Sequence, residues 1–183
     1  MFVPSFGQIA NHVVISEVYG GGGNSGSTWK NDFIELYNPT SFPVNLNGWS
    51  VQYGSATGSF NNNTGLTALS GIIPSHGFFL IKEAQGTLGT LDLPTADVTG
   101  TIAISGTVGK IALSKQSTSA VTGPADTSVV DFVGFGTTAS LFEGSGPTPA
   151  PSNTQSVERK GKANSTAISL ASGGADADSG NGY

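Results

Sequence analysis

The stretch VVISEVYGGGGNSGSTWKNDFIELYNPTSFPVNLNGWSVQY, residues 13–53, decides the fold. It contains three short apolar runs, at 12–19, 32–37 and 48–53, separated by segments rich in glycine, asparagine and proline. Such runs with turn residues between them predict β-strands, and no window carries the apolar stripe of a helix. The same pattern continues in the runs 77–83, 100–104, 108–114, 128–135 and 155–159. The chain is therefore predicted to be all-β, an antiparallel sandwich or barrel.

A run of four glycines, residues 20–23, lies between the first two predicted strands. Gly21, Gly23 and Gly26 match the G-x-G-x-x-G pattern of dinucleotide-binding loops, which also requires a helix at the third glycine. Residues 27–31 are too few to form a crossover helix before the next strand. We therefore expect a long, flexible link that binds no nucleotide, because glycine adopts positive φ at no steric cost.

A second glycine motif, GTVGKIA at residues 106–112, resembles a shortened P-loop. It lacks both the spacing of that motif and the Ser or Thr after its lysine. The sequence therefore predicts a turn followed by a strand here, and no phosphate site.

The composition limits the classes of partner. Only 10% of the 183 residues are charged, against about 25% in typical domains, and the net charge is −5. Seven Lys and Arg residues form no basic face, which argues against a nucleic-acid partner. With no cysteine, disulfides and thiolate sites are excluded, and no apolar stretch approaches the roughly 20 residues of a membrane span.

The chain length suits one domain, which we expect at residues 12–183. Residues 1–11 are expected to be a flexible segment, and they read as the end of a secretory signal peptide or as an ordinary terminus. The low charge and the abundance of Ser, Thr and Asn suit a secreted or cell-surface protein that contacts a protein or polysaccharide surface.

Carboxylates within the predicted strands are candidate metal ligands. Strand alternation places Glu17 on the face of Ile15 and Tyr19, and it also gives Glu35 apolar neighbours. A partly buried carboxylate needs a cation or several hydrogen-bond donors. Glu17, Asp32 and Glu35 are therefore candidates to hold calcium with loop carbonyls. The alternative is that each accepts structural hydrogen bonds from backbone amides.

The C-terminal segment GGADADSGNGY, residues 173–183, is a second candidate calcium site. Asp176 and Asp178 supply hard oxygen ligands at short spacing, although no Glu follows at the distance required in an EF-hand. The alternative is a solvated terminus.

Nothing in the sequence indicates catalysis. His12 and His76 have no Ser–Asp arrangement beside them, and no G-x-S-x-G motif occurs. We therefore expect a protein that is not an enzyme. Trp29, the only bulky apolar residue of the glycine-rich link, is predicted to contact a partner, and the alternative is that it packs against the edge of the sandwich.

The opening stretch is similar to the start of a lamin tail domain of the bacterial kind, and the similarity extends over residues 12–183. Further similar segments are GTIAISGTVGKIAL at 100–113 and the region 129–160. Matching positions include Ile15, Glu17, Asp32, Phe33, Ile34, Glu35, Leu36, Asn38, Val44, Leu46, Gly48, Trp49, Tyr53, Asp131, Gly134, Glu143 and Arg159.

The resemblance implies an immunoglobulin-like antiparallel β-sandwich with Trp49 in its core. It implies a non-catalytic binding or structural module of a secreted or surface protein, one that mediates contacts with proteins or surfaces or self-association. The alternatives are an accessory substrate-binding domain of an extracellular nuclease or phosphatase-type hydrolase, and a calcium-dependent adhesion module.

Overall fold

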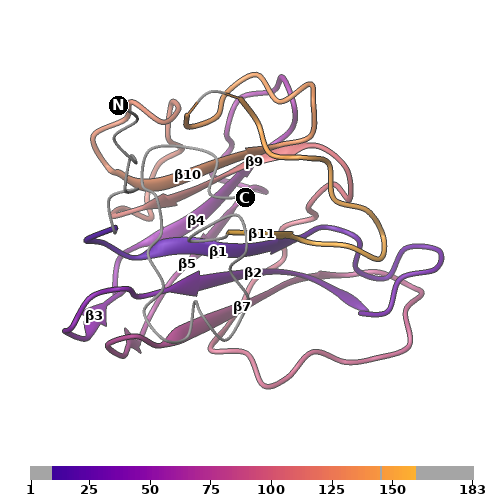
Figure 1. Ribbon diagram of the computed structural model, residues 1–183, viewed down its shortest axis with the longest axis horizontal. Helices are drawn as coiled ribbons and strands as arrows, with labels where there is room; N and C mark the ends of the chain where they lie inside the picture. The colour runs from indigo at the N-terminus through magenta and orange to yellow at the C-terminus, as the bar shows by residue number, and fades with distance from the viewer. Residues whose placement is uncertain (1–9, 145, 160–183) are drawn as a thin grey trace, which may run out of the picture.

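The computed structural model describes residues 10–144 and 146–159, which form β-strands, turns and loops but no helix (Figure 1). The strands are β1 (Val14–Tyr19), β2 (Asn31–Tyr37), β3 (Val44–Asn45), β4 (Ser50–Gly54), β5 (Leu66–Ala68), β6 (Ile72–Ile73), β7 (Phe78–Gln85), β8 (Val98–Thr99), β9 (Gly109–Ser114), β10 (Val129–Phe135) and β11 (Val157–Glu158). One sheet has the order β11-β1-β2-β7-β8, a second has the order β10-β9-β4-β5, and β3 pairs with β6.

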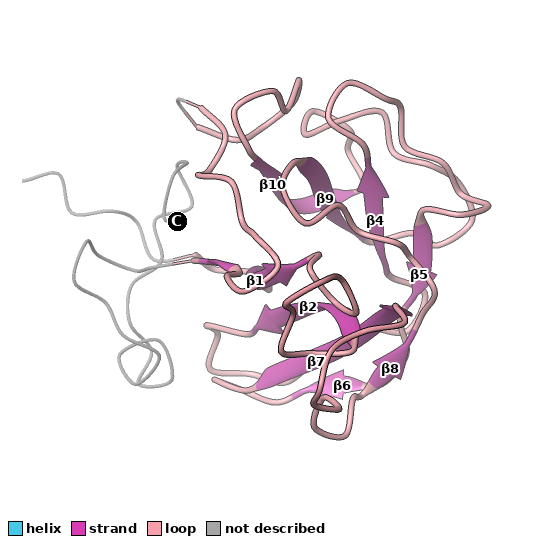
Figure 2. Cartoon of the chain, turned by 90° about the vertical axis from the view of Figure 1, so that its right-hand side faces the viewer, coloured by secondary structure: helices cyan, strands magenta, loops and turns pink. Residues whose placement is uncertain are grey.

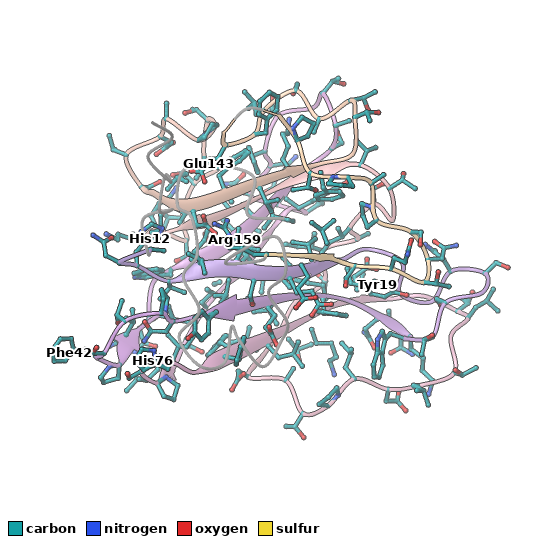
Figure 3. All side chains as sticks on the ribbon, in the orientation of Figure 1. His12, Tyr19, Phe42, His76, Glu143 and Arg159 are labelled. Atoms are coloured by element: carbon teal, nitrogen blue, oxygen red, sulfur yellow. The ribbon has the colours of Figure 1, made fainter. Side chains whose placement is uncertain are left out.

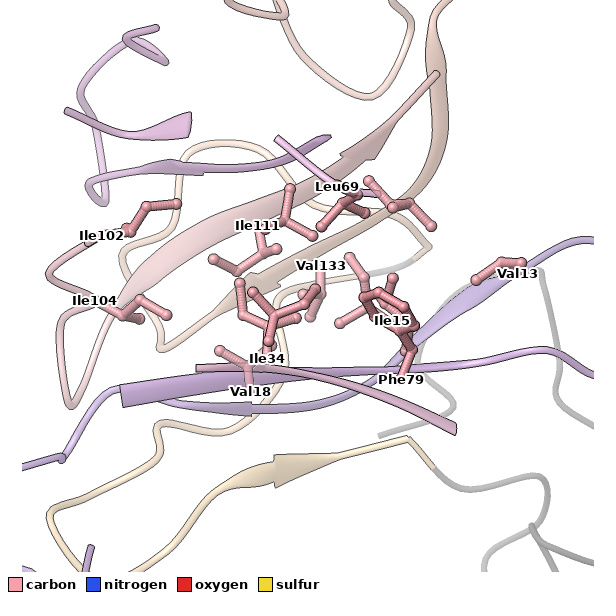
Figure 4. Close-up of a cluster of buried hydrophobic side chains, with 14 of the residues drawn as sticks. Val13, Ile15, Val18, Ile34, Leu69, Phe79, Ile102, Ile104, Ile111 and Val133 are labelled. Atoms are coloured by element: carbon pink, nitrogen blue, oxygen red, sulfur yellow. The ribbon is translucent and has the colours of Figure 1, made fainter. Parts of the chain in front are cut away.

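The two larger sheets pack face to face as an immunoglobulin-like β-sandwich (Figure 2). Side chains from both inner faces fill the space between them, as Figure 4 shows. Ile15, Val18 and Ile34 come from one sheet, and Ile111 and Val133 come from the other, all of them at most 2% exposed. This interdigitated apolar layer is what the alternation of the strands dictates, since one face of each sheet must be removed from water.

Seven of the eight predicted strands are present, within about two residues at each end. The sequence missed β3, β5, β6 and β8, which have only two or three residues each and therefore too little pattern to detect. Trp49 immediately precedes β4 and packs against the core while remaining half-buried. Val51 and Tyr53 follow it on the same face, as predicted.

The predicted strand at 100–104 is wrong in its hydrogen bonding. Ile102 and Ile104 point into the core, but their backbone N–H groups donate to carboxylates instead of to a neighbouring strand. Ile102 N donates to Oε2 of Glu83 at 2.8 Å, and Ile104 N donates to Oδ2 of Asp32 at 2.9 Å. The segment still bonds to β7, because Gly100 N donates to the Lys82 carbonyl at 2.8 Å and Ala84 N donates to the Ile102 carbonyl at 3.0 Å. Two inward-facing carboxylates therefore accept the N–H groups that a regular strand would have paired, which residue periodicity alone does not reveal.

The predicted face of Glu17 is also wrong. The β1–β2 register shifts between Ile15 and Glu17, so the strict alternation of side chains breaks there. Ile15 and Val18 both face the core, whereas Glu17 and Tyr19 face the opposite side of the sheet. The bulge thus carries Glu17 away from the core.

The glycine run at 20–23 is not the flexible link that we expected. All four residues are buried, and the loop is hydrogen-bonded, with Gly22 N donating to Oδ1 of Asp32 at 2.9 Å and Gly23 N to the carbonyl of Trp29 at 2.8 Å. A Cβ on Gly22 would collide with the backbone of Asn31 and Asp32. Glycine is needed here because two backbones approach closely.

A buried ion pair joins the last strand to both sheets. Arg159 Nη2 donates to both carboxylate oxygens of Asp131 at 2.9 and 3.0 Å, and Arg159 Nε donates to the carbonyl of Ile15 at 3.0 Å. The same Asp131 carboxylate accepts the N–H of Ile15 at 2.6 Å. The residues matched at 131 and 159 in the sequence comparison with lamin tails therefore fasten β10 to β1, a structural role.

Candidate functional site

Three glutamates lie side by side on the outer face of the β11-β1-β2-β7-β8 sheet. Glu158 on β11 is the register partner of Glu17 on β1, and Glu17 is the register partner of Glu35 on β2. We call Glu17, Glu35 and Glu158 the glutamate row. Like charges directly opposite one another destabilise a sheet, so this arrangement has a cost that packing does not explain.

The pKa values of Glu17 and Glu35 reflect this repulsion. Burial raises the pKa of Glu17, the charge of Glu158 raises it further, and a hydrogen bond with the Ser156 side chain lowers it. Burial likewise raises the pKa of Glu35, against a hydrogen bond donated by the Ser16 hydroxyl at 2.8 Å, and the charges of Glu17 and Glu158 add to the increase. A bound cation would relieve this repulsion by favouring the ionised carboxylates.

An aromatic pocket borders the row at Glu17. The rings of Tyr19 and Phe33 stack with their centroids 5.3 Å apart at 30°, and the half-buried Trp29 faces the same space. The pocket has a volume of about 120 Å³ and is lined by Glu17, Tyr19, Thr28, Trp29, Phe33, Thr154 and Ser156. We call it the aromatic pocket. Tyr19 lies towards the end of the sheet from which the glycine-rich loop projects (Figure 3).

Hydrogen bonds hold the two walls of the aromatic pocket in place. The Tyr19 hydroxyl donates to the carbonyl of Asn153 at 2.6 Å, which joins β1 to the segment that precedes β11. Trp29 forms a parallel bridge with Leu91, and Lys30 N donates to the Leu91 carbonyl at 3.0 Å. The buried glycines bring this loop against the sandwich, so Trp29 is positioned by the fold.

The chemistry of this face suits a positively charged group. Aromatic faces attract cations within about 6 Å of the ring centroid, and carboxylates pair with them directly. The half-buried Trp29 supplies the accessible aromatic surface, with the buried rings of Tyr19 and Phe33 behind it, and Glu17 supplies the carboxylate that lines the pocket. At this volume the pocket admits the end of one long side chain, such as the ammonium group of a lysine.

The structure does not bring the predicted calcium ligands together. Asp32 faces the core, where Gly22 and Ile104 donate to its two oxygens, whereas Glu17 and Glu35 face outward. Burial raises the pKa of Asp32 to about 6, against the lowering effect of these two hydrogen bonds. In residues 10–144 and 146–159, no three His, Asp or Glu side chains are grouped so as to hold a metal ion.

The other predicted ligands, Asp176 and Asp178, lie outside the described residues. His76 lies in the turn between Pro74 and Gly77, where Gly77 N donates to the Pro74 carbonyl at 3.0 Å, with φ of 54°. It is therefore a turn residue, as the sequence indicated.

Sequence reasoning missed several residues of this face. Glu158 and Phe33 belong to the site because β1 is flanked by β11 and β2, and β11 comes from the far end of the described chain. The buried Glu83 was also missed, although alternation along β7 places it on the face of Phe79 and Ile81. The burial of Glu83 could therefore have been predicted from the sequence, whereas no sequence pattern indicates that β11 pairs with β1.

The fold defines an immunoglobulin-like binding or structural module. The sequence profile of the Lamin Tail Domain family matches residues 8–179, nearly the whole chain. The chain belongs to this family, whose members are structural immunoglobulin-like domains. A comparison with curated proteins gave no match. No helix in the described part of the chain is long and apolar enough to cross a membrane.

Proposed function

We propose that this protein is a non-catalytic binding module of a secreted or cell-surface bacterial protein, and that it contacts a cationic segment of a partner protein. The observation that carries the proposal is the glutamate row, three carboxylates in adjacent register, next to the aromatic pocket. A sheet tolerates such repulsion at a site where a ligand offsets it.

The charge of this face favours a protein partner over a polysaccharide or a nucleic acid. Negative charge on this face repels nucleic-acid phosphates and attracts lysine or arginine. The aromatic pocket would enclose one ammonium or guanidinium group while the row pairs with its neighbours along the partner chain. The extracellular location is supported by the low charge of the chain.

Titration with a trilysine peptide tests the proposal, with triglutamate as the reference peptide. Binding to trilysine should be lost in Glu17→Gln and weakened in Trp29→Ala, because these changes remove the nearest carboxylate and one aromatic wall. Phe42→Ala and Asp92→Asn are matched controls, since both side chains are exposed and neither lines the pocket. Equal binding of the two peptides would refute the proposal.

The pH dependence provides a second readout. The pKa values of Glu17 and Glu35 are raised without a ligand, and a cation favours their ionised forms. Trilysine affinity should therefore increase as the pH rises through these pKa values. An affinity that decreases over that range would contradict a role for the row.

Self-association is a second candidate role. Phe42 and Ile72 are 75% and 62% exposed, and Figure 3 shows Phe42 projecting from the end of the sandwich that lies opposite Tyr19. Exposed apolar side chains of this size are typical of contact surfaces, so a second copy of the chain is a candidate partner at this end.

A further inference from the structure

Among residues 10–144 and 146–159, a buried lysine on the other sheet has no charged partner. Lys110 lies on β9 and is 1% exposed. Its Nζ donates to the carbonyl of Gly58 at 2.7 Å and to Oγ of Ser140 at 3.2 Å, and it lies 5.7 Å from the centroid of the Phe60 ring. All three partners are neutral. Within the described ranges, no carboxylate forms a salt bridge with this ammonium group.

Such a charge is expensive to bury. Buried charges in proteins are normally paired, and desolvation without a counter-charge disfavours the charged form. Burial accordingly lowers the pKa of Lys110. Asp126 lies in the loop region that covers the same sheet, but its carboxylate accepts hydrogen bonds from Thr122 and Ser128. The described chain therefore leaves the Lys110 charge uncompensated.

Lys110 also lines a cavity, which we call the Lys110 pocket. Loops cover the outer face of the β10-β9-β4-β5 sheet and enclose a second apolar cluster around Phe60, Val121 and Phe132. The pocket has a volume of about 510 Å³ and is lined by Thr57, Gly58, Ser59, Phe60, Lys110, Ala120, Val121, Thr122, Ser140 and Leu141. This size lies within the range of about 300–1,000 Å³ that is usual for small-molecule sites.

The lining is divided by polarity. Phe60 and Val121 are buried and supply apolar surface, together with the half-buried Leu141. The hydroxyl residues Thr57, Ser59, Thr122 and Ser140 are exposed and form the rim. Small-molecule sites are mostly apolar and contain a few polar groups that orient the ligand. The Lys110 pocket has this composition, with one buried cation, an apolar interior and hydroxyl groups at the rim.

We propose that the Lys110 pocket binds a small molecule made of one carboxylate and an apolar body. The carboxylate pairs with Nζ of Lys110, which supplies the missing counter-charge through a charge-assisted hydrogen bond. The apolar body contacts Phe60, Val121 and Leu141. A single ammonium group matches one carboxylate better than a phosphate cluster, and it repels a cation. This site is separate from the glutamate row, which lies on the outer face of the other sheet.

Calorimetric titration of the full chain with octanoate tests this proposal, with octanol as the uncharged probe of the same length. Wild type should bind octanoate in a saturable manner, and octanol at least about tenfold more weakly, because octanol lacks the charge. Lys110→Met, which keeps most of the side-chain volume, should weaken octanoate binding to the level of octanol. Lys115→Met is the matched control, since Lys115 is exposed at the end of the same strand and outside the pocket.

The test remains decisive if Lys110→Met fails to fold. Thr122→Trp places a large ring on the exposed rim, where it should block octanoate entry without disturbing the core. No saturable octanoate binding by wild type, equal affinity for octanoate and octanol, or unchanged binding in a folded Lys110→Met or Thr122→Trp protein would each overturn the proposal.

Discussion

Replacing Glu83 by Gln should stabilise the protein at high pH and leave it nearly unchanged at low pH. Glu83 is 1% exposed, and its Oε2 accepts the N–H of Ile102 at 2.8 Å. Burial raises its pKa from 4.5 to about 7, hydrogen bonds with Thr67 and Ile102 lower it, and the charge of Asp32 raises it. Gln keeps an acceptor for Ile102 and nearly the same side-chain volume, so the packing is preserved.

The sign and size of this effect follow from proton linkage. Because the folded pKa of Glu83 is higher than the unfolded value, folded Glu83 holds its proton over a range where the unfolded chain has lost it. The contribution of Glu83 to the free energy of unfolding therefore decreases as the pH rises from 4.5 to about 7, and it then stays level. The difference between the folded and unfolded pKa of Glu83 corresponds to a loss of about 3 kcal/mol of stability once Glu83 is fully ionised, since each tenfold change in proton affinity is worth about 1.4 kcal/mol.

Urea unfolding of wild type and Glu83→Gln at about pH 4.5 and about pH 8 measures the effect. The free energy of unfolding of the variant should equal that of wild type at the lower pH. At the higher pH it should be larger by up to about 3 kcal/mol, which corresponds to an increase of about 6–12 °C in Tm. Asp92→Asn is the matched control, because that carboxylate is 77% exposed and its removal should leave the wild-type pH dependence in place. A difference between Glu83→Gln and wild type that is the same at both pH values would refute the reasoning.

Three further predictions concern the loop, the glutamate row and the exposed end of the sandwich. Gly22→Ala should lower the free energy of unfolding by about 1–3 kcal/mol, because its Cβ would meet backbone atoms that cannot move aside. Gly146→Ala, with open space around its Cβ, should change stability little in the same urea titration; an equal loss in both would contradict the role of close approach. Glu17→Gln should leave the response of Tm to calcium unchanged, because Glu17 and Asp32 lie on opposite faces of the sheet and do not form a shared site. An increase in Tm with calcium that Glu17→Gln abolishes would contradict this arrangement, since an ion bound there would stabilise the protein by about 2.7 kcal/mol at about 100 times its Kd. Phe42→Ser should reduce any dimer detected by light scattering after gel filtration, and a wild type that is strictly monomeric at high concentration would exclude self-association through this end.

The core of the sandwich could be predicted because burial follows local alternation. Ile34 and Leu36 on β2, and Val51 on β4, lie on the inward faces that the period of two assigns to them. The same rule failed at Glu17, since the bulge after Ile15 depends on how β1 pairs with β2 and leaves no mark in the composition of β1. Alternation therefore predicts which residues a regular strand buries, and it fails where pairing is irregular.

The candidate site could be predicted only in part. Glu17, Glu35 and Trp29 were singled out because each is a charged or bulky residue among apolar or glycine neighbours. Their assembly with Glu158, Tyr19 and Phe33 required the register of three strands, one of which comes from the far end of the described chain. The Lys110 pocket had no sequence signal, because its walls come from three loops that meet only in the folded state.

The sequence by itself determined the all-β class, the family and most of the strands, because these depend on residue spacing within short segments. The tertiary structure alone decided that the glycines at 20–23 are close-packed and that Asp32 and Glu83 accept the N–H groups of Ile104 and Ile102. It also decided that Glu17, Glu35 and Glu158 stand in one row. The physical reason is that close backbone contacts, hydrogen bonds and neighbouring charges depend on which segments lie side by side in the fold. The order of residues along the chain does not show which segments these are.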